Sequence, residues 1–122
     1  MHYKRIELKV TNQGIHEHKI FQGVKIFNRS KLSKDQKSIL TQKLYLTPKQ
    51  NIVYYQRTDI NYDQNWYHHK DYYELAFDQL DRETVFKVCR YFDELSPFLE
   101  NELLEKLKKK QSAGKFFEKL DI

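Results

Sequence analysis

The chain has 122 residues, which is enough for one domain with a real core but too few for two independent cores. Its charged share is 32% and its net charge is +5, yet 15% of the residues are aromatic, and the area these rings can bury argues against a disordered chain. The sequence holds no run of about 18 apolar residues and no signal-peptide pattern, and its one cysteine cannot form an internal disulfide, so we expect a cytoplasmic protein without a membrane span.

Alternation of polar and apolar residues predicts a hairpin at the start of the chain. Residues 3–10 alternate as a strand covered on one side does, turn residues follow, and residues 19–27 alternate again. Gly23 inside the second strand indicates a bulge or a close approach of another backbone. Residues 28–37 are polar and rich in lysine, and they predict a loop or a short helical turn.

Three further strands are predicted in the middle of the chain. Residues 38–47 and 52–57 form a second hairpin, because Pro48 removes a ladder donor between them and the second segment is rich in β-branched and aromatic residues. Residues 59–71 read as a polar loop. Residues 72–77 return to alternation and predict the fifth strand.

Two amphipathic helices are predicted over residues 78–113. The apolar stripe of the first recurs at i, i+3, i+4 and i+7 and consists of Val85, Val88, Cys89 and Phe92. Ser96 followed by Pro97 is a helix start signal, an N-cap with proline at the first helical position. The stripe of the second helix consists of Leu99, Leu103, Leu104 and Leu107.

These elements predict an α+β fold. An antiparallel sheet of about five strands, made of two hairpins plus a fifth strand, would be covered on one face by two C-terminal helices. Residues 1–122 would form a single domain, with sheet mainly in 1–77, a helical hairpin in 78–113 and a tail in 114–122. The uncovered face would carry much of the tyrosine, and the open sheet edges lead us to expect a homodimer.

The ending Glu118-Lys119-Leu120-Asp121-Ile122 carries a resemblance to a known family. The chain resembles the bacterial EXLDI protein family, which is named for this ending. Shorter similarities are Phe21-Gln22-Gly23, Leu44 to Lys49 leading into Val53-Tyr54-Tyr55, Trp66, and Leu75-Ala76-Phe77-Asp78. The family has no established biochemical function. Some members carry an N-terminal segment that resembles ribbon-helix-helix DNA-binding proteins and implies a regulatory role, whereas this sequence begins directly with the first predicted strand.

The polar loop contains a candidate binding site. Its aromatic and imidazole side chains are Tyr62, Trp66, Tyr67, His68 and His69. Amphipathic rings of this kind form contacts at low entropic cost, as they do in binding loops. The alternative is that Trp66 and one tyrosine anchor the loop onto the sheet, and both hypotheses stay open because one loop can do both.

The tail contains a candidate interaction segment, Glu118, Leu120, Asp121 and Ile122. In one interpretation its apolar residues pack against the sheet or a sister subunit while its acids pair with lysines. In the other, the terminal carboxylate and Ile122 insert together into the pocket of a partner. Packing, including packing across a dimer, is the favoured interpretation.

No cofactor, metal or catalytic residue is assigned. His16 and His18 fall on one face of a strand and supply only half of a zinc site. Cys89 falls on an apolar stripe, where we expect a core thiol with a raised pKa rather than a nucleophile. The chain has no P-loop, dinucleotide fingerprint, nucleophile elbow or zinc-protease motif.

The charge is divided along the chain, which bears on nucleic-acid binding. Residues 1–58 hold 12 Lys/Arg against 3 Asp/Glu, whereas residues 59–105 hold 4 against 12. The basic residues interleaved with tyrosines in the predicted sheet are Lys19, Lys25, Lys43 and Arg57. Such a sheet would stack bases and neutralise phosphates. Solvated charged faces are the commoner explanation of such patterns, and the acidic half would repel a polyanion.

From the sequence we therefore predict a non-enzymatic binding or regulatory module that acts through protein or ligand contacts. A nucleic-acid-binding protein that uses the basic, tyrosine-rich sheet is the alternative, and an enzyme of unrecognised type comes third. The expected partners are a second copy of the chain and a protein, with nucleic acid as the less favoured partner and no membrane.

Overall fold

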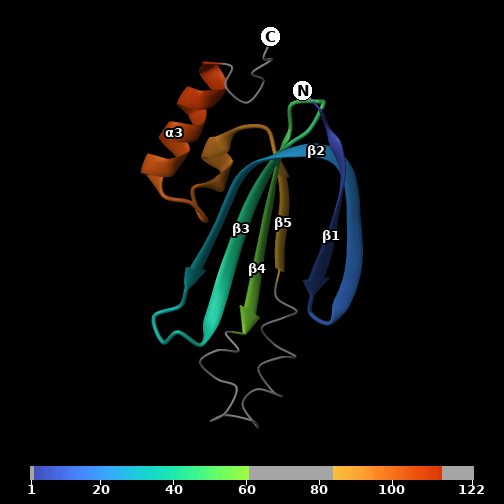
Figure 1. Cartoon of the computed structure of the whole chain (residues 1–122), viewed down its shortest axis with the longest axis vertical. Helices are drawn as coiled ribbons and strands as arrows, with labels where there is room; N and C mark the ends of the chain where they lie inside the picture. The colour runs from blue at the N-terminus through green and yellow to red at the C-terminus, as the bar shows by residue number, and fades with distance from the viewer. Residues whose placement is uncertain (1, 61–83, 114–122) are drawn as a thin grey trace.

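The computed structural model describes residues 2–60 and 84–113 of the chain. Its strands are β1 (Lys4–Asn12), β2 (Ile15–Leu32), β3 (Ser38–Leu46), β4 (Ile52–Ile60) and β5 (Thr84–Cys89). They form one antiparallel sheet in which each strand lies beside its neighbours in sequence, in the order β1-β2-β3-β4-β5. A 3-10 helix, η1 (Phe92–Leu95), and then the helix α3 (Asn101–Ser112) follow the last strand (Figure 1).

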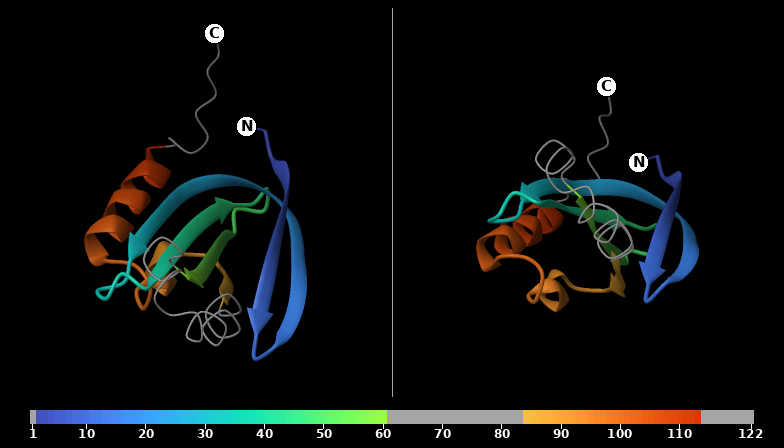
Figure 2. Two further views of the ribbon diagram at one scale, coloured as in Figure 1. Left: turned by 60° about the horizontal axis from the view of Figure 1, so that its bottom comes forward. Right: turned by 90° about the horizontal axis from the view of Figure 1, so that it is seen from below.

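Strand β2 pairs with a different strand along each half of its 18 residues. Residues 15–23 lie beside β1, and residues 24–32 lie beside β3. Between the two halves the strand arches over one end of the sheet, so that its two legs run in opposite directions (Figures 1 and 2). The sheet is therefore strongly curled, and the β1–β2 hairpin folds over one face of β3 and β4.

Gly23 lies where β2 turns from one partner strand to the other. A Cβ atom at this position would lie 2.9 Å from the Cε2 atom of Phe21 and 3.3 Å from the carbonyl oxygen of Leu46. The close backbone approach predicted from this glycine is confirmed. A register shift between Lys25 and Phe27 adds a bulge just beyond it, which bends the strand further.

The tight turn of the first hairpin follows the sequence signal. Gln13 and Gly14 both have positive φ, 51° and 80°, as a two-residue turn of type I′ requires. In the second hairpin the amide N–H of Thr47 donates to the carbonyl of Asn51 at 3.0 Å, which closes the turn between β3 and β4. Both predicted hairpins are present.

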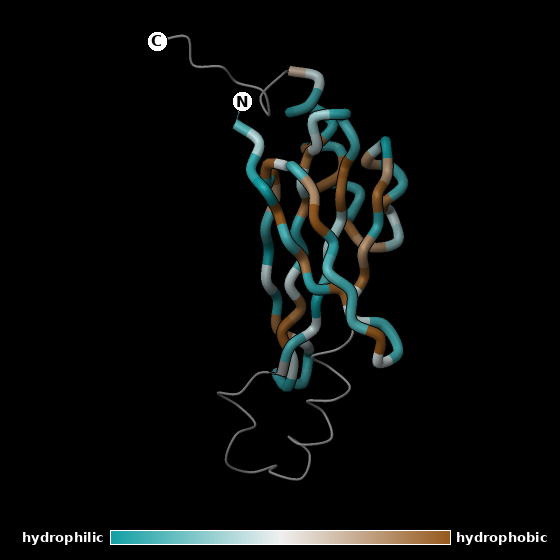
Figure 3. The backbone as a smooth tube through the Cα atoms, turned by 90° about the vertical axis from the view of Figure 1, so that its right-hand side faces the viewer, coloured by the Kyte–Doolittle hydropathy of each residue, from teal (hydrophilic) through white to brown (hydrophobic). Residues whose placement is uncertain are grey.

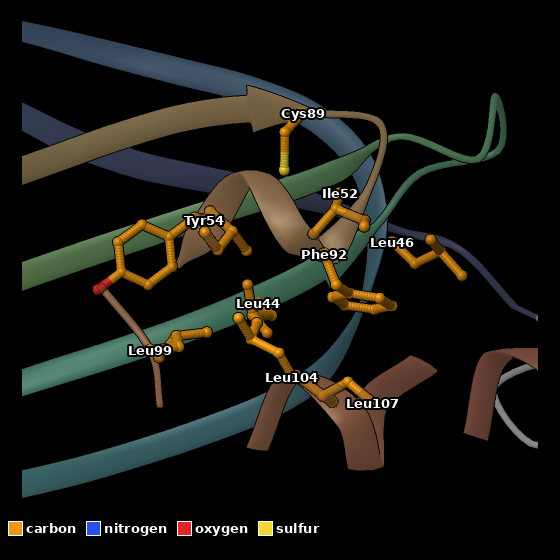
Figure 4. Close-up of a cluster of buried hydrophobic side chains, with 10 residues drawn as sticks. Leu44, Leu46, Ile52, Tyr54, Cys89, Phe92, Leu99, Leu104 and Leu107 are labelled. Carbon is orange, nitrogen blue, oxygen red and sulfur yellow. The ribbon is translucent and has the colours of Figure 1, made fainter. Parts of the chain in front are cut away.

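One face of β3 and β4 carries a cluster that we call the outer core, and η1 and α3 cover it. Its buried members are Leu44, Leu46, Ile52, Tyr54, Cys89, Phe92, Leu95, Leu99, Leu104 and Leu107. Figure 4 shows the two leucines of α3 pointing toward the side chains of the sheet. Because Leu104 and Leu107 are three residues apart, they lie on one face of the helix. Burial of each such leucine stabilises the fold by about 1.5–3 kcal/mol.

The opposite face of β3 and β4 carries a second cluster, the inner core, and the β1–β2 hairpin covers it. Its buried members are Leu8, Tyr45, Val53 and Tyr55, with Ile6, Val10, Phe21 and Phe86 packed against them. Neighbouring residues such as Val53 and Tyr54 enter opposite clusters because side chains alternate along a strand. Figure 3 shows the corresponding alternation of hydrophobic and hydrophilic residues along the strands.

Side chains join the first strand to the last two, and we call this contact the seam. The hydroxyl oxygen of Thr84 accepts a hydrogen bond from the amide of Thr11 at 2.8 Å and donates one to the carbonyl of Thr11 at 3.0 Å. The hydroxyl of Tyr55 donates to the carbonyl of Lys9 at 2.7 Å. These bonds occupy backbone groups on the edge of β1 that is not paired with β2, and that part of the edge cannot pair with another strand.

A polar cluster fastens the start of α3 to the sheet. The side-chain carbonyl of buried Gln42 accepts from Nε and Nη2 of Arg29 at 3.0 and 2.6 Å. The amide of Gln42 donates to the hydroxyl of Tyr54 at 3.0 Å and to the carbonyl of Phe98 at 3.1 Å. Arg29 also donates to both carboxylate oxygens of Glu100, at 2.7 and 2.9 Å. This bidentate pair lowers the pKa of Glu100 to about 2.

The prediction of two C-terminal helices is wrong. Residues 84–89, assigned to the first helix, form strand β5, and Phe92 begins the short helix η1. The second predicted helix is present, but it begins at Asn101 rather than at Pro97. The segment pairs with β4 as a strand and places apolar residues on both of its faces: Cys89 enters the outer core and Phe86 packs on the inner core.

Two further predictions fail. The tyrosines of β3 and β4 do not lie on an uncovered face, because Tyr45, Tyr54 and Tyr55 are only 4%, 0% and 3% exposed. Residues 28–32 are not a loop but the end of β2. The predicted strand at 72–77 lies outside the described residues. None of the described helices has both the length and the apolar character needed to cross a membrane.

Candidate ligand-binding groove

A groove with a volume of about 670 Å³ lies between β2, the β3–β4 turn and β5. On one side it is lined by residues 18–22 of β2, and on the other by Phe86 and Val88 of β5. The turn at residues 47–51 supplies one end, and Val53 of β4 contributes from the inner core. We call this cavity the β2–β5 groove.

Apolar side chains form the walls of the β2–β5 groove. Val88 is 54% exposed, although large aliphatic side chains are usually buried. Phe21 and Phe86 of the lining are half-buried, and Val53 is buried. The groove therefore offers a continuous apolar surface that no described residue covers.

The charged groups of the β2–β5 groove are all basic. His18, Lys19 and Lys49 line it, and no Asp or Glu does. The ammonium group of Lys19 lies 2.8 Å from a carboxylate oxygen of Glu17 and 5.7 Å from the centre of the Phe86 ring. Lys49 forms no ion pair with any residue in the described ranges 2–60 and 84–113. Among the described residues, the groove thus has a cation without a carboxylate partner at its turn end.

The ring nitrogen Nδ1 of His18 lies 3.1 Å from a carboxylate oxygen of Glu7. This contact is exposed to solvent and is made outside the groove lining. The imidazole of His18 therefore contacts Glu7 of β1 and not another residue of the groove lining.

A second cavity of about 640 Å³ lies on the other side of Lys19, near the tip of the first hairpin. It is lined by the last residues of β1, the first residues of β2, which include Glu17, and the start of β5. Lys19 and Phe86 line both cavities, so their contact separates the two. The second cavity is the more polar of the two because Asn12, Gln13 and Glu17 line it.

Three basic residues follow one diagonal across the inner face of the sheet. Lys43 pairs with Tyr55, Lys25 pairs with Tyr45, and Arg57 lies two residues beyond Tyr55 on β4. Burial and the positive charges of Lys25 and Arg57 lower the pKa of Lys43. Of the three, Arg57 has a close carboxylate partner, since its Nε lies 2.8 Å from Asp59. This diagonal carries a net positive charge.

The two candidate sites predicted from the sequence lie outside the described residues. These are the loop residues Tyr62, Trp66, Tyr67, His68 and His69 and the tail residues Glu118, Leu120, Asp121 and Ile122. Nothing in the fold tests their proposed roles.

The two histidines of β2 do not converge on a common point. Nδ1 of His16 lies 3.0 Å from the hydroxyl of Thr11, whereas His18 contacts Glu7. Within residues 2–60 and 84–113, no group of three or more His, Cys, Asp or Glu side chains is arranged to hold a metal ion.

The expectation that Cys89 is a core thiol is confirmed, although the residue ends a strand rather than lying on a helix. It is buried in the outer core, and this burial raises the pKa of its thiol to about 11. A thiol in this state is protonated at neutral pH and is a poor nucleophile.

The sequence analysis missed the residues of the β2–β5 groove. The available signal was the alternation of Phe86 and Val88, which places both side chains on one face if the segment is a strand. Ile20 gave no signal, because its exposure follows from lying on the face of the β1–β2 hairpin opposite to the inner core, which the sequence alone does not show.

Comparison with known proteins identifies no relative for this arrangement: no family model, no curated protein and no solved structure matches the chain. The resemblance to the EXLDI family therefore stays a prediction.

Proposed function

We propose that the protein is a non-enzymatic binding module whose ligand occupies the β2–β5 groove. The observation that carries this proposal is the open apolar surface formed by Phe21, Phe86 and Val88. Its volume of about 670 Å³ falls within the range of about 300–1,000 Å³ that is typical of small-ligand sites. Exposed apolar side chains gathered around a cavity are a common mark of a binding surface.

The chemistry of the lining supports binding rather than catalysis. Acid-base or nucleophilic catalysis needs a titratable group held within hydrogen-bonding reach of a second one. The lining contains no Asp, Glu, Cys or Ser, and its single imidazole, that of His18, contacts Glu7 instead. His18 and Lys19 are each paired with a carboxylate that lies outside the lining, that of Glu7 and that of Glu17, so the groove itself provides a surface for a ligand.

The proposal is tested with Nile red, a neutral apolar dye whose emission shifts to shorter wavelength when it leaves water. We expect saturable binding to the full chain. Val88→Glu places a charge in the groove and should abolish this binding. Leu32→Glu is the matched control, because Leu32 is also exposed, at 55%, but lies at the far end of β2. Equal dye binding by the Val88→Glu variant and the wild-type protein would refute the proposal.

A second candidate function, nucleic-acid binding, is favoured by the diagonal of Lys25, Lys43 and Arg57 on the inner face. The proposed stacking of bases on tyrosines loses its support, because the tyrosines of β3 and β4 are buried. The remaining contribution is electrostatic, so binding of a labelled single-stranded oligonucleotide should weaken steeply between about 50 and 200 mM salt. Binding that Lys43→Glu leaves unchanged would exclude this diagonal as the site.

The remaining expectations are proposals about partners and location. We propose a cytoplasmic protein that forms a homodimer, although part of the β1 edge is already occupied by Thr84 and Tyr55. Light scattering over a range of protein concentrations measures the oligomeric state. Affinity purification with and without residues 118–122 tests the tail as a contact with a protein partner.

A further inference from the structure

We infer that the ligand of the β2–β5 groove is a small amphipathic anion: an apolar chain or ring that carries one carboxylate, with the carboxylate beside Lys49. This inference rests on the proposed function and specifies the chemical class of the ligand. It follows from three features of the groove, namely the sign of its charges, the position of Lys49, which forms no ion pair with the described residues, and the character of its walls.

The charges that face the groove are complementary to an anion. The β2 side contributes His18 and Lys19, the turn contributes Lys49, and the β4 and β5 residues of the lining contribute no charge. The carboxylates that contact lining residues are those of Glu17, which pairs with Lys19, and Glu7, which pairs with His18, among the described residues. An anionic ligand therefore meets no carboxylate in the lining, whereas a cationic ligand would find no charged partner there.

Lys49 is the cation best placed to receive the carboxylate. Lys19 already has Glu17 as a partner, whereas Lys49 has no ion pair among the described residues. Its backbone is held in the β3–β4 turn, where the N–H of Gln50 donates to the carbonyl of Thr47 at 2.9 Å. The side chain of Lys49 is exposed at the end of the groove. A carboxylate bound there keeps part of its hydration, and its cost of desolvation is small.

The walls select for the apolar part of the ligand. Phe21, Phe86 and Val88 present carbon atoms along the groove, and the ligand's methylene groups would leave water on contact with them. Each buried methylene should strengthen binding about fourfold. Affinity should consequently rise steadily from hexanoate to octanoate to decanoate until the groove is filled.

The experiment uses the full chain and measures displacement of Nile red by three ten-carbon probes of different charge: decanoate, 1-decanol and decyltrimethylammonium. We expect decanoate to bind up to about fivefold more tightly than decanol, as a single exposed charge pair provides, and decyltrimethylammonium to bind more weakly than decanol. Lys49→Glu should remove the preference for decanoate and leave the affinity for decanol unchanged. Lys34→Glu is the matched control, because it makes the same charge change in the loop between β2 and β3, away from the groove.

The possible results separate this inference from the proposed function. If neither decanoate nor decanol displaces the dye, the proposed function fails. If both displace it equally, or if Lys49→Glu and Lys34→Glu have the same effect on decanoate, the groove binds ligands but the inferred carboxylate contact is wrong. Decanoate binding that weakens as protein concentration rises would show that a second copy of the chain occupies the groove, and it would overturn the inference.

Discussion

Substitution of Thr84 by valine should destabilise the fold by about 2–3 kcal/mol. Valine has nearly the same shape but removes the hydroxyl that accepts from the amide of Thr11 and donates to its carbonyl, at 2.8 and 3.0 Å. The lost bond to the Thr11 carbonyl costs about 1 kcal/mol net, and the Thr11 amide left without a partner costs about 1–2 kcal/mol, which is within the usual penalty for a buried unpaired donor. Thr11 is only 1% exposed, so water cannot easily replace the lost partner.

Urea unfolding followed by circular dichroism measures the change in the free energy of unfolding. Thr58→Val in β4 is the matched control, because the hydroxyl of Thr58 makes no hydrogen bond with the described residues, and we expect it to change stability by less than about 0.5 kcal/mol. Thr84→Ser keeps the hydroxyl and should retain most of the stability. Hydrogen exchange of the Thr11 amide should accelerate in Thr84→Val alone. If Thr84→Val costs no more than Thr58→Val, the seam does not stabilise the fold as described.

Three further outcomes are expected. Cys89 is buried and the pKa of its thiol is raised to about 11, so Ellman's reagent at pH 8 should react slowly with the folded protein and rapidly with the protein unfolded in urea. Fast reaction of the folded protein would contradict this burial. The pKa of Glu100 is lowered to about 2 by Arg29, so the stabilisation it provides is present above its unfolded pKa of about 4.5 and is lost as pH falls toward 2. The stability difference between wild type and Glu100→Gln, measured by urea unfolding, should shrink over that interval, and Glu102→Gln should show no such trend. Leu104→Ala removes a buried contact of α3 and should cost about 2–5 kcal/mol in thermal or urea unfolding; a smaller loss would show that α3 is not firmly packed on the sheet.

The first four strands were predictable because their signals are local. Alternation identified the segments 3–10 and 38–47, and turn residues such as Gly14 identified the hairpins. The length of β2 was not predictable, because the last part of its second leg, from Asn28 to Leu32, is mostly polar and exposed. The backbone pairing with β3 maintains that segment as a strand, and pairing partners cannot be read from a single polar segment.

The error at residues 84–89 has a general physical cause. A short run with apolar residues on both faces shows no clear period, and its residues match a helical spacing as well as an extended one. Val85 and Cys89 face the outer core while Phe86 faces the inner core, so apolar residues occur on both sides. The β-branched and aromatic content of the segment favours a strand, and this preference is the better guide here than the helical spacing.

The β2–β5 groove depends on contacts that are distant in sequence, which is why sequence reasoning did not find it. Phe21 and Phe86 are 65 positions apart in the numbering, and they approach only because the first hairpin folds over the sheet. The sequence also could not show that Lys49 forms no ion pair with the described residues, because ion pairing of a charged turn residue depends on the fold.

The sequential pairing of the strands determines the order in which the molecule can assemble. Each strand finds its partner directly before it in the chain, so four strands can pair during synthesis before residue 84 has been added. The contact between Thr11 and Thr84 spans 73 positions and has to wait for the last strand. The inner core therefore remains open to water on one side through most of folding, and joining the two ends of the sheet is the step that seals it.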